Sequence, residues 1–296
     1  MPDPDAPPPP EPAGPGRRFL RWWVDDLPPI DGRLRFLIYA GLLVLTQMHS
    51  KSFLLGIQGY EATDPELYNA RGLFEALGLS YISPGTVRII IGVTVVAWVC
   101  AAIGLFSRFS AVLTAAGVFF LHGLFLDTNA GNRTWVLPLY AILAMCFACS
   151  WDTWSVDFHL RKKFRKSPAP KDRPASICCT GFARKLFLVA VVGFYTASGI
   201  SKLSSAGVWW ADGRTLQYFA EGRDYFLTSL LADNLWLCTV VSVVALLIEA
   251  LAFLALLSPR LRIVFLILWS LMHLGIRHSL GPWYGTNIWC FILLVD

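Results

Sequence analysis

Long apolar runs, separated by shorter polar segments, dominate the chain after residue 33. Eight runs can be distinguished, at residues 34–50, 86–106, 109–126, 135–151, 186–200, 235–257, 261–277 and 283–295. A helix needs about 20 residues to cross the hydrocarbon core of a bilayer. The runs at 86–106 and 235–257 are clearly long enough, whereas those at 34–50, 186–200 and 283–295 are short. The pattern predicts an all-α integral membrane protein, a polytopic bundle of about eight transmembrane helices.

The composition agrees with a membrane protein. Of the 296 residues, 55% are apolar and 15% are charged, and the mean hydropathy is +0.54, whereas soluble domains carry about 25% charged residues. The first sixteen residues are acidic and rich in proline, so residues 1–33 are predicted to be a disordered tail and a pre-helix segment. Residues 34–296 form one membrane domain. No cleavable signal peptide is evident, so the first membrane helix would act as an uncleaved signal.

The placement of basic residues predicts the orientation. If eight spans alternate, 17 of the 25 lysines and arginines share a side with the N-terminus, many of them in the basic loop 152–185. Cytoplasmic segments carry the excess of lysine and arginine, so both termini are predicted to be cytoplasmic in a cell-membrane protein. The tract "RKKFRK" at 161–166 either binds anionic lipid headgroups or serves only as an orientation signal.

The same orientation gathers unusual polar and aromatic residues at the extracytoplasmic ends of the spans. They are His49, Lys51, His122, Asn129, Asn132, Arg133, Lys202, Trp209, Trp210, His273, Arg277 and His278. Ionisable groups at membrane depth are costly and usually face the bundle interior or a wet cavity. The set predicts a polar cavity open to that side. Taken singly, Lys202 also fits a snorkelling anchor, the tryptophans fit an interfacial belt, and each histidine fits a packing role.

Glu249 is a carboxylate in the apolar stretch "ALLIEALAFL", toward the inner half of the sixth run. Such a group is protonated, hydrogen-bonded to another helix, or part of a proton path. The sequence does not name its partner.

Several other chemistries are unsupported. The chain has no phosphate-binding glycine loop, no H-E-x-x-H and no serine nucleophile elbow. The C-x-x-C at Cys146 and Cys149 has no metal-binding partners near it, so no metal site is predicted. The one basic tract lacks interleaved aromatic residues, which argues against nucleic-acid binding.

The stretch "YTASGISKLSSAGVWWADG", residues 195–213, resembles the Y-x-x-(A/S)-G-x-x-K-L…W-x-x-G signature of the HTTM (horizontally transferred transmembrane) family. This family is related to the membrane domain of vitamin K-dependent gamma-carboxylase. Further pieces resemble the family in matching order, namely "RFLIYAGLLVL", "GLFSRFSAVL", "NAGNRTWVLPLYAIL", "SWDTWSVD", "LLIEALAFLALLSPRLR" and "LMHLGIRHSLG". The resemblance covers about residues 34–296.

The resemblance implies a role for Lys202 as the general base that deprotonates a reduced, vitamin K-like quinone. In the carboxylase, oxygen then converts the quinol anion to an alkoxide, which takes a proton from a glutamate side chain that captures carbon dioxide. Loss of hydration at the edge of an apolar pocket would favour the neutral amine that such a base needs. In this resemblance, Arg133 stands where the carboxylase has a histidine, and the carboxylase's large luminal region has no counterpart before Asp296. A base-and-quinol step, or a different modification, is therefore better supported than carboxylation of a protein glutamate.

Three functions follow from these observations. The first is a carboxylase-like enzyme in which Lys202 is the base and Arg133, His273 and His278 assist, with an isoprenoid quinone and an exported peptide as partners in the bilayer. The second is a non-catalytic accessory protein for maturation of an exported peptide, or a quinone-binding subunit. The third is a transporter with a proton path through Glu249 and the histidines, but no inverted repeat or pair of broken helices supports it.

Overall fold

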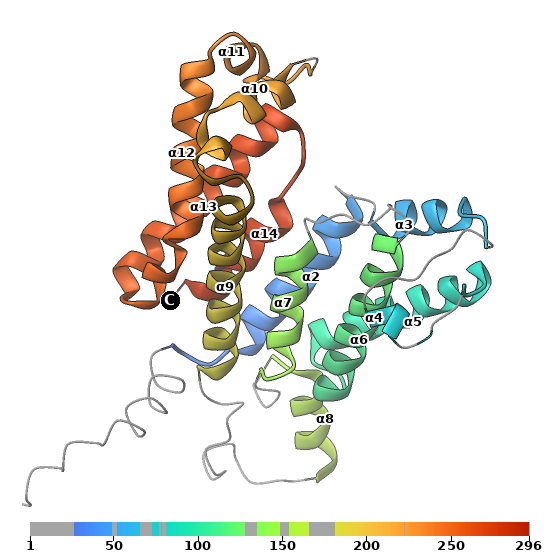
Figure 1. The fold of residues 1–296 in the computed structure, drawn as a ribbon. Coiled ribbons are helices and arrows are strands. Elements are labelled where there is room, and N and C mark those ends of the chain that lie inside the picture. The colour runs from blue at the N-terminus through green and yellow to red at the C-terminus, as the bar shows by residue number, and fades with distance from the viewer. Residues whose placement is uncertain are drawn as a thin grey trace, which may run out of the picture.

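A computed structural model describes residues 27–48, 52–65, 73–76, 78, 81–127, 135–148, 154–165, 181–221 and 223–295. All regular structure in these residues is helical (Figure 1). The α-helices are α2 (Gly32–Met48), α3 (Ser52–Glu61), α4 (Leu73–Ala76), α5 (Pro84–Ile103), α6 (Ser107–Asp127), α7 (Val136–Met145), α8 (Val156–Arg165), α9 (Phe182–Ala206), α10 (Arg214–Ala220), α11 (Thr228–Ala232), α12 (Leu235–Ala250), α13 (Pro259–Leu280) and α14 (Gly285–Cys290). Three 3-10 helices continue them, namely η4 (Gly207–Ala211), η5 (Ala252–Leu256) and η6 (Phe291–Leu294).

The apolar helices make this a multi-pass membrane protein. Four are long and apolar enough to cross a bilayer, at Pro84–Ile103, Ser107–Phe125, Phe182–Ala211 and Pro259–Leu280. Each of the eight predicted runs coincides with a helix, but α7, α12 and α14 are shorter apolar helices, so eight spans are not established. Many large apolar side chains are exposed on the surface, as expected where lipid replaces water.

Two boundaries differ from the prediction. The fifth run was predicted to end at residue 200, yet α9 and η4 continue to Ala211. The serines after the apolar run do not break the helix, because Ser205 Oγ donates to the Ser201 carbonyl at 2.7 Å and so satisfies its own hydroxyl. The predicted loop 152–185 contains α8, and residues 166–180 lie outside the described part. Of the predicted tail, residues 1–26 lie outside it, while Leu27 and Ile30 are buried.

Helices α5 and α6 form a hairpin, and α5 is capped at both of its ends. Pro84 opens α5, and Ser83 Oγ accepts a hydrogen bond from the Thr86 N–H at 3.2 Å. Gly104 ends the helix with a φ of 70°, in the left-handed region that glycine adopts without strain. Along the hairpin, Gly117 packs directly on the side chain of Thr94, where a Cβ would lie 2.1 Å from Oγ1. Small residues therefore set the close approach of the two helices.

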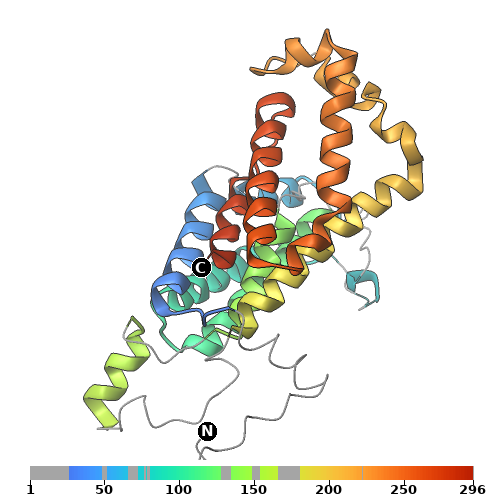
Figure 2. The ribbon, with the colours of Figure 1, turned by 90° about the vertical axis from the view of Figure 1, so that its left-hand side faces the viewer.

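Helix α9 is central to the second half of the chain. It contacts α7, α12, η4, η5 and η6, while α13 contacts η5, α12 and α14. Figure 2 shows α9 running obliquely, with α12 and α13 standing more upright beside it. The short helices α10 and α11 pack on one end of α12 around Ala220, Leu231 and Cys238. The main core joins both halves of the chain through buried residues of α2, α6, α7, α9 and α13.

Candidate functional site

One face of α9 carries the residues that build the candidate site. Tyr195, Ser198, Gly199 and Lys202 are spaced by three, four and seven positions, which places them on one side of a helix. A Cβ on Gly199 would lie 2.5 Å from the backbone nitrogen of Ala250. Only glycine permits this approach without displacement of one helix, so Gly199 brings the end of α12 directly onto α9.

Lys202 and Glu249 form an ion pair across this contact. The Lys202 ammonium donates a hydrogen bond to Glu249 Oε2, and Ser198 Oγ donates to the same oxygen at 3.3 Å. The ammonium also lies 4.5 Å from the ring centroid of Trp210, a cation–π contact. The structure therefore identifies Lys202 as the partner of Glu249, which the sequence could not name.

The two charged side chains of this pair are unequally exposed. The Lys202 side chain is 24% exposed, whereas that of Glu249 is 9% exposed. The carboxylate is thus held inside the bundle, and the lysine forms the edge of the site. An incoming molecule would meet Lys202 and the Trp210 ring before it met Glu249.

Tyr195 and His273 form a second pair, two helical turns before Lys202. The Tyr195 hydroxyl lies 2.6 Å from His273 Nε2. The Tyr195 ring stacks on Trp269 with centroids 4.5 Å apart, and the His273 ring stacks on Tyr284 at 4.6 Å. The Nδ1 atom of His273 is buried and has no hydrogen-bond partner among the described residues. Aromatic packing on both sides fixes the two rings, so their polar edges meet in one geometry.

The two pairs form one row along α9. Tyr195 bonds to His273, and it lies one helical turn before Ser198, which donates to Glu249. We call His273, Tyr195, Glu249, Ser198 and Lys202 the α9 polar row. Within each pair the two acid–base groups are in hydrogen-bond contact, as a proton transfer between them requires. Tyr195 and Ser198 were not singled out from the sequence as site residues, although their spacing from Lys202 was a sufficient signal.

Other residues predicted for the site make their contacts elsewhere. The ring of His122 on α6 stacks on Trp135, with centroids 6.3 Å apart. Trp209 is 75% exposed. Beyond the row on α13, the Arg277 guanidinium donates to the Gly281 carbonyl, and the His278 ring lies 6.5 Å from that of Phe226.

Five predicted residues cannot be placed. Asn129, Asn132 and Arg133 lie outside the described residues, as do His49 and Lys51. Among the residues that the structure describes, no group of three or more histidine, cysteine, aspartate or glutamate side chains has the geometry to hold a metal ion.

The helices and the row define an all-helical, multi-pass membrane protein with a paired lysine and carboxylate on one of its central helices. The family model of the HTTM domain matches residues 34–280, which is most of the chain and includes the whole α9 polar row. The chain therefore belongs to the HTTM domain family, as the sequence pattern indicated. No curated protein and no solved structure matches the chain.

Proposed function

We propose that this protein is a membrane enzyme of the vitamin K-dependent carboxylase-like class that removes a proton from a quinol, or a related weakly acidic hydroxyl, at Lys202. One observation carries the proposal: Lys202, at the partly exposed edge of the row, contacts a buried carboxylate that is able to take its proton. The orientation from lysine and arginine placement would put this edge at the extracytoplasmic face.

Glu249 provides the step that turns Lys202 into a base. An ammonium cannot accept a proton, so Lys202 must first give one up. Transfer to Glu249 converts an ion pair into a neutral amine and a carboxylic acid, and the net charge of the pair stays zero. The Lys202 amine then takes the hydroxyl proton of the substrate, and the resulting ammonium lies beside the new oxyanion.

The surroundings of Lys202 fit a flat aromatic substrate with an apolar tail. The Trp210 ring is already positioned over the ammonium, and Trp209 presents an exposed ring next to it in sequence. An isoprenoid quinol would stack on such rings and leave its tail in the bilayer. His273 acts through Tyr195 as a second acid–base pair in this proposal. His278 and Arg133 remain as assisting groups, with Arg133 holding an anion where the carboxylase has a histidine.

Lys202→Arg is the most informative variant. Arginine keeps a positive charge opposite Glu249 but does not lose its proton in proteins. Full-length protein in mild detergent would be mixed with a reduced naphthoquinone under air, where oxygen oxidises the quinol anion to the quinone. Mass spectrometry would follow the loss of quinol above the rate of a protein-free sample. We expect the wild type to consume the quinol, and Lys202→Arg and Lys202→Ala to be inactive while still inserting in the membrane. Quinol consumption by purified Lys202→Arg at the wild-type rate would refute the base role.

A second function has its own supporting observation. The Lys202–Glu249 and Tyr195–His273 contacts join α9 to α12 and α13, which is how polar side chains hold membrane helices together. On this basis the row is structural, and the protein is an accessory factor for maturation of an exported peptide, or a quinone-binding subunit. A stoichiometric protein partner that co-purifies equally with wild type and Lys202→Arg would favour this function. Mass spectrometry of the native preparation for bound quinone would distinguish the accessory factor from the quinone-binding subunit.

A further inference from the structure

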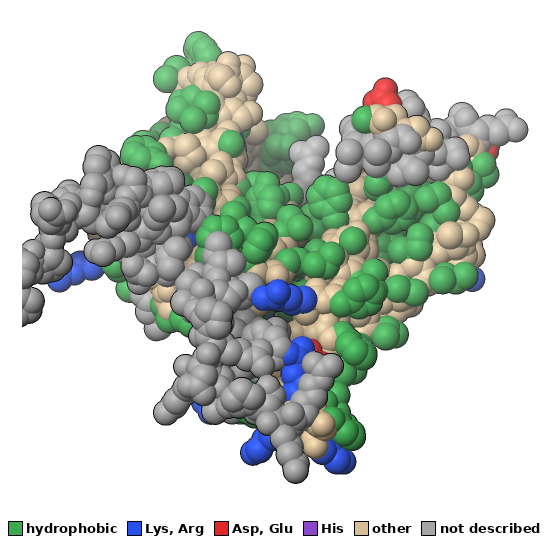
Figure 3. All heavy atoms as spheres, turned by 90° about the horizontal axis from the view of Figure 1, so that it is seen from below, with side chains coloured by type: hydrophobic (Ala, Val, Ile, Leu, Met, Phe, Trp, Pro, Cys, Tyr) green, Lys and Arg blue, Asp and Glu red, His purple; other side chains and the backbone are tan. Residues whose placement is uncertain are grey.

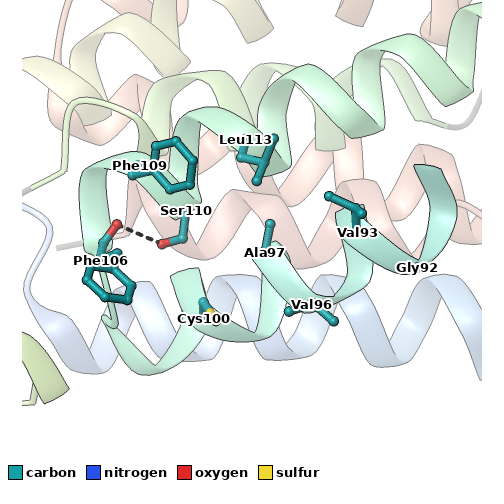
Figure 4. A pocket seen from close by; sticks show the side chains of 9 residues that line it. All are labelled: Gly92, Val93, Val96, Ala97, Cys100, Phe106, Phe109, Ser110 and Leu113. Carbon is teal, nitrogen blue, oxygen red and sulfur yellow. Dashed lines mark hydrogen bonds between the residues drawn. The ribbon is translucent and has the colours of Figure 1, made fainter. Parts of the chain in front are cut away.

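A groove with a volume of about 370 Å³ lies between α5 and α6 (Figure 4). It is lined by Gly92, Val93, Val96, Ala97 and Cys100 from α5, and by Phe106, Phe109, Ser110 and Leu113 from the turn and α6. The α5 residues recur at intervals of three or four, so the groove follows one face of that helix. Both helices are long and apolar enough to span a bilayer. The volume falls in the range of small-molecule sites.

The groove offers an apolar surface throughout. Its one hydroxyl belongs to Ser110, which donates to the carbonyls of Leu105 at 3.0 Å and Phe106 at 3.2 Å and is therefore already engaged. The bordering side chains of Val96 and Phe109 are 64% and 71% exposed. A ligand in this groove would be a flexible apolar chain rather than a polar head.

A basic helix is fixed at the Phe106 end of the groove. The Asp157 carboxylate, in the first turn of α8, accepts hydrogen bonds from the N–H groups of Phe106 at 2.8 Å and Ser107 at 2.9 Å. Ser155 Oγ donates to the Gly104 carbonyl at 2.7 Å. These bonds join residues about 50 positions apart, so the start of α8 and the end of the groove form one rigid unit.

Helix α8 has the properties of a helix at the membrane surface. Its side chains Leu160 and Phe164, four positions apart, are exposed and share one face. Lys162 and Lys163 are also exposed, and the Lys163 ammonium lies 5.6 Å from the ring centroid of Phe164. Figure 3, viewed from the end where α8 lies, shows lysine and arginine side chains gathered beside a broad apolar surface. Exposed apolar and basic groups on one short helix are typical of interfacial helices that meet anionic lipid.

We propose that the α5–α6 groove and α8 form a binding site for one anionic phospholipid, with an acyl chain in the groove and the headgroup against Lys162 and Lys163. Charge complementarity selects the occupant: the groove accepts any acyl chain, but the lysines of α8, whose first turn is bonded to the end of the groove, favour a lipid with a net negative headgroup. The site is separate from the α9 polar row and does not depend on the proposed function.

Two matched pairs of variants test the site. Gly92→Leu fills the groove, because a Cβ at Gly92 has no atom within 4 Å, and Gly193→Leu on α9 is its control with the same open surroundings. Lys162→Glu with Lys163→Glu reverses two charges on α8, and the double variant Arg260→Glu with Arg214→Glu, at two exposed positions on other helices, is the control for net charge. Each full-length protein would be placed in bilayers of equal phosphatidylglycerol and phosphatidylcholine with identical acyl chains. Native mass spectrometry would then count the lipids that stay bound.

We expect the wild type and both controls to retain one phosphatidylglycerol in preference to phosphatidylcholine. Gly92→Leu should lose the retained lipid. In the Lys162, Lys163 double variant, the ratio of retained phosphatidylglycerol to phosphatidylcholine should fall roughly tenfold or more, since each lysine contributes separately to attraction of anionic lipid. Equal retention of both lipids by the wild type would overturn the proposal, as would a wild-type result for either test variant. If Gly92→Leu is not helical and monodisperse, Val96→Trp fills the same groove and takes its place.

Discussion

The α5–α6 hairpin and the α9 polar row are both contacts between membrane helices, but they use polar side chains differently. In the hairpin, Ser83 and Asp157 hydrogen-bond to backbone N–H groups at helix ends, where free donors need partners. In the row, Lys202 with Glu249 and Tyr195 with His273 pair side chain to side chain within the helices.

This difference separates hydrogen bonds that complete the helices from side-chain pairs that the helices do not require. Caps satisfy backbone groups that any helix leaves free. The hydrogen bonds of Ser83 and Asp157 are therefore explained by the structure of the hairpin. The pairs of the row satisfy no backbone group and carry the cost of desolvating ionisable side chains. In the hairpin, Gly117 packs directly on the Thr94 side chain, so two of these helices reach close packing through a small residue. Packing alone therefore does not account for the row, which favours a chemical role.

Removal of Lys202 should have the largest effect on stability. Lys202→Met leaves the buried Glu249 carboxylate without its cation and should lower the free energy of unfolding by about 3 kcal/mol. Glu249→Leu should cost less, because the partly exposed Lys202 side chain can turn toward water. The double variant should recover most of the Lys202→Met loss. Unfolding in mixed detergent and SDS measures all three, and additive losses would show that the two residues do not depend on each other.

The Gly199 contact comes next. Gly199→Ala places a methyl group against the Ala250 backbone and should cost about 2 kcal/mol, as overpacking does. Gly193→Ala, six positions earlier on the same helix, meets nothing within 4 Å and should be neutral or stabilising. The same SDS titration compares them. Equal effects of the two substitutions would mean that the close approach of α9 and α12 is unimportant.

Helices were predictable from the sequence because long apolar runs are a local signal. The eight predicted runs all coincide with helices, and the HTTM family was correctly identified from the α9 motif and the ordered pieces around it. The number of spans was not predictable in the same way, because α7, α12 and the segment Gly285–Leu294 are apolar helices shorter than a bilayer crossing usually needs. Helix α8 was missed because its charge indicated a loop, although Leu160 and Phe164 already had helical spacing.

The contacts of the site were harder to predict. Position within a run placed Glu249 toward the inner side and Lys202 at the outer end, as if every helix stood upright. Helix α9 is long and oblique (Figure 2), so depth does not follow residue number, and Lys202 meets Glu249 directly. Likewise, the predicted grouping of histidines rested on their side of the membrane. Of the described ones, His273 belongs to the row, while His122 and His278 contact Trp135 and Phe226.

Loss of the Tyr195 hydroxyl should have an intermediate effect. Tyr195→Phe keeps the stack on Trp269 but leaves His273 Nε2 buried without its partner, so stability should fall by about 1–2 kcal/mol. The double variant Tyr195→Phe with His273→Phe should cost less than the sum of the two single changes, because neither polar group is then left alone. Thermal unfolding in detergent provides the comparison. Strictly additive losses of stability would show that Tyr195 and His273 do not interact as a pair.

The smallest effect should come from the cap that closes the hairpin. Asp157 accepts bonds from two backbone N–H groups and the Ser107 hydroxyl, so Asp157→Ala should cost about 1 kcal/mol. The control is Asp212→Ala, since Asp212 accepts only a local bond from the Arg214 N–H and forms a solvent-exposed ion pair worth a few tenths of a kcal/mol. Neither change should alter quinol consumption. If Asp157→Ala abolished that activity at unchanged stability, the hairpin would share the chemistry of the row, and the division between structural caps and reactive pairs would fail.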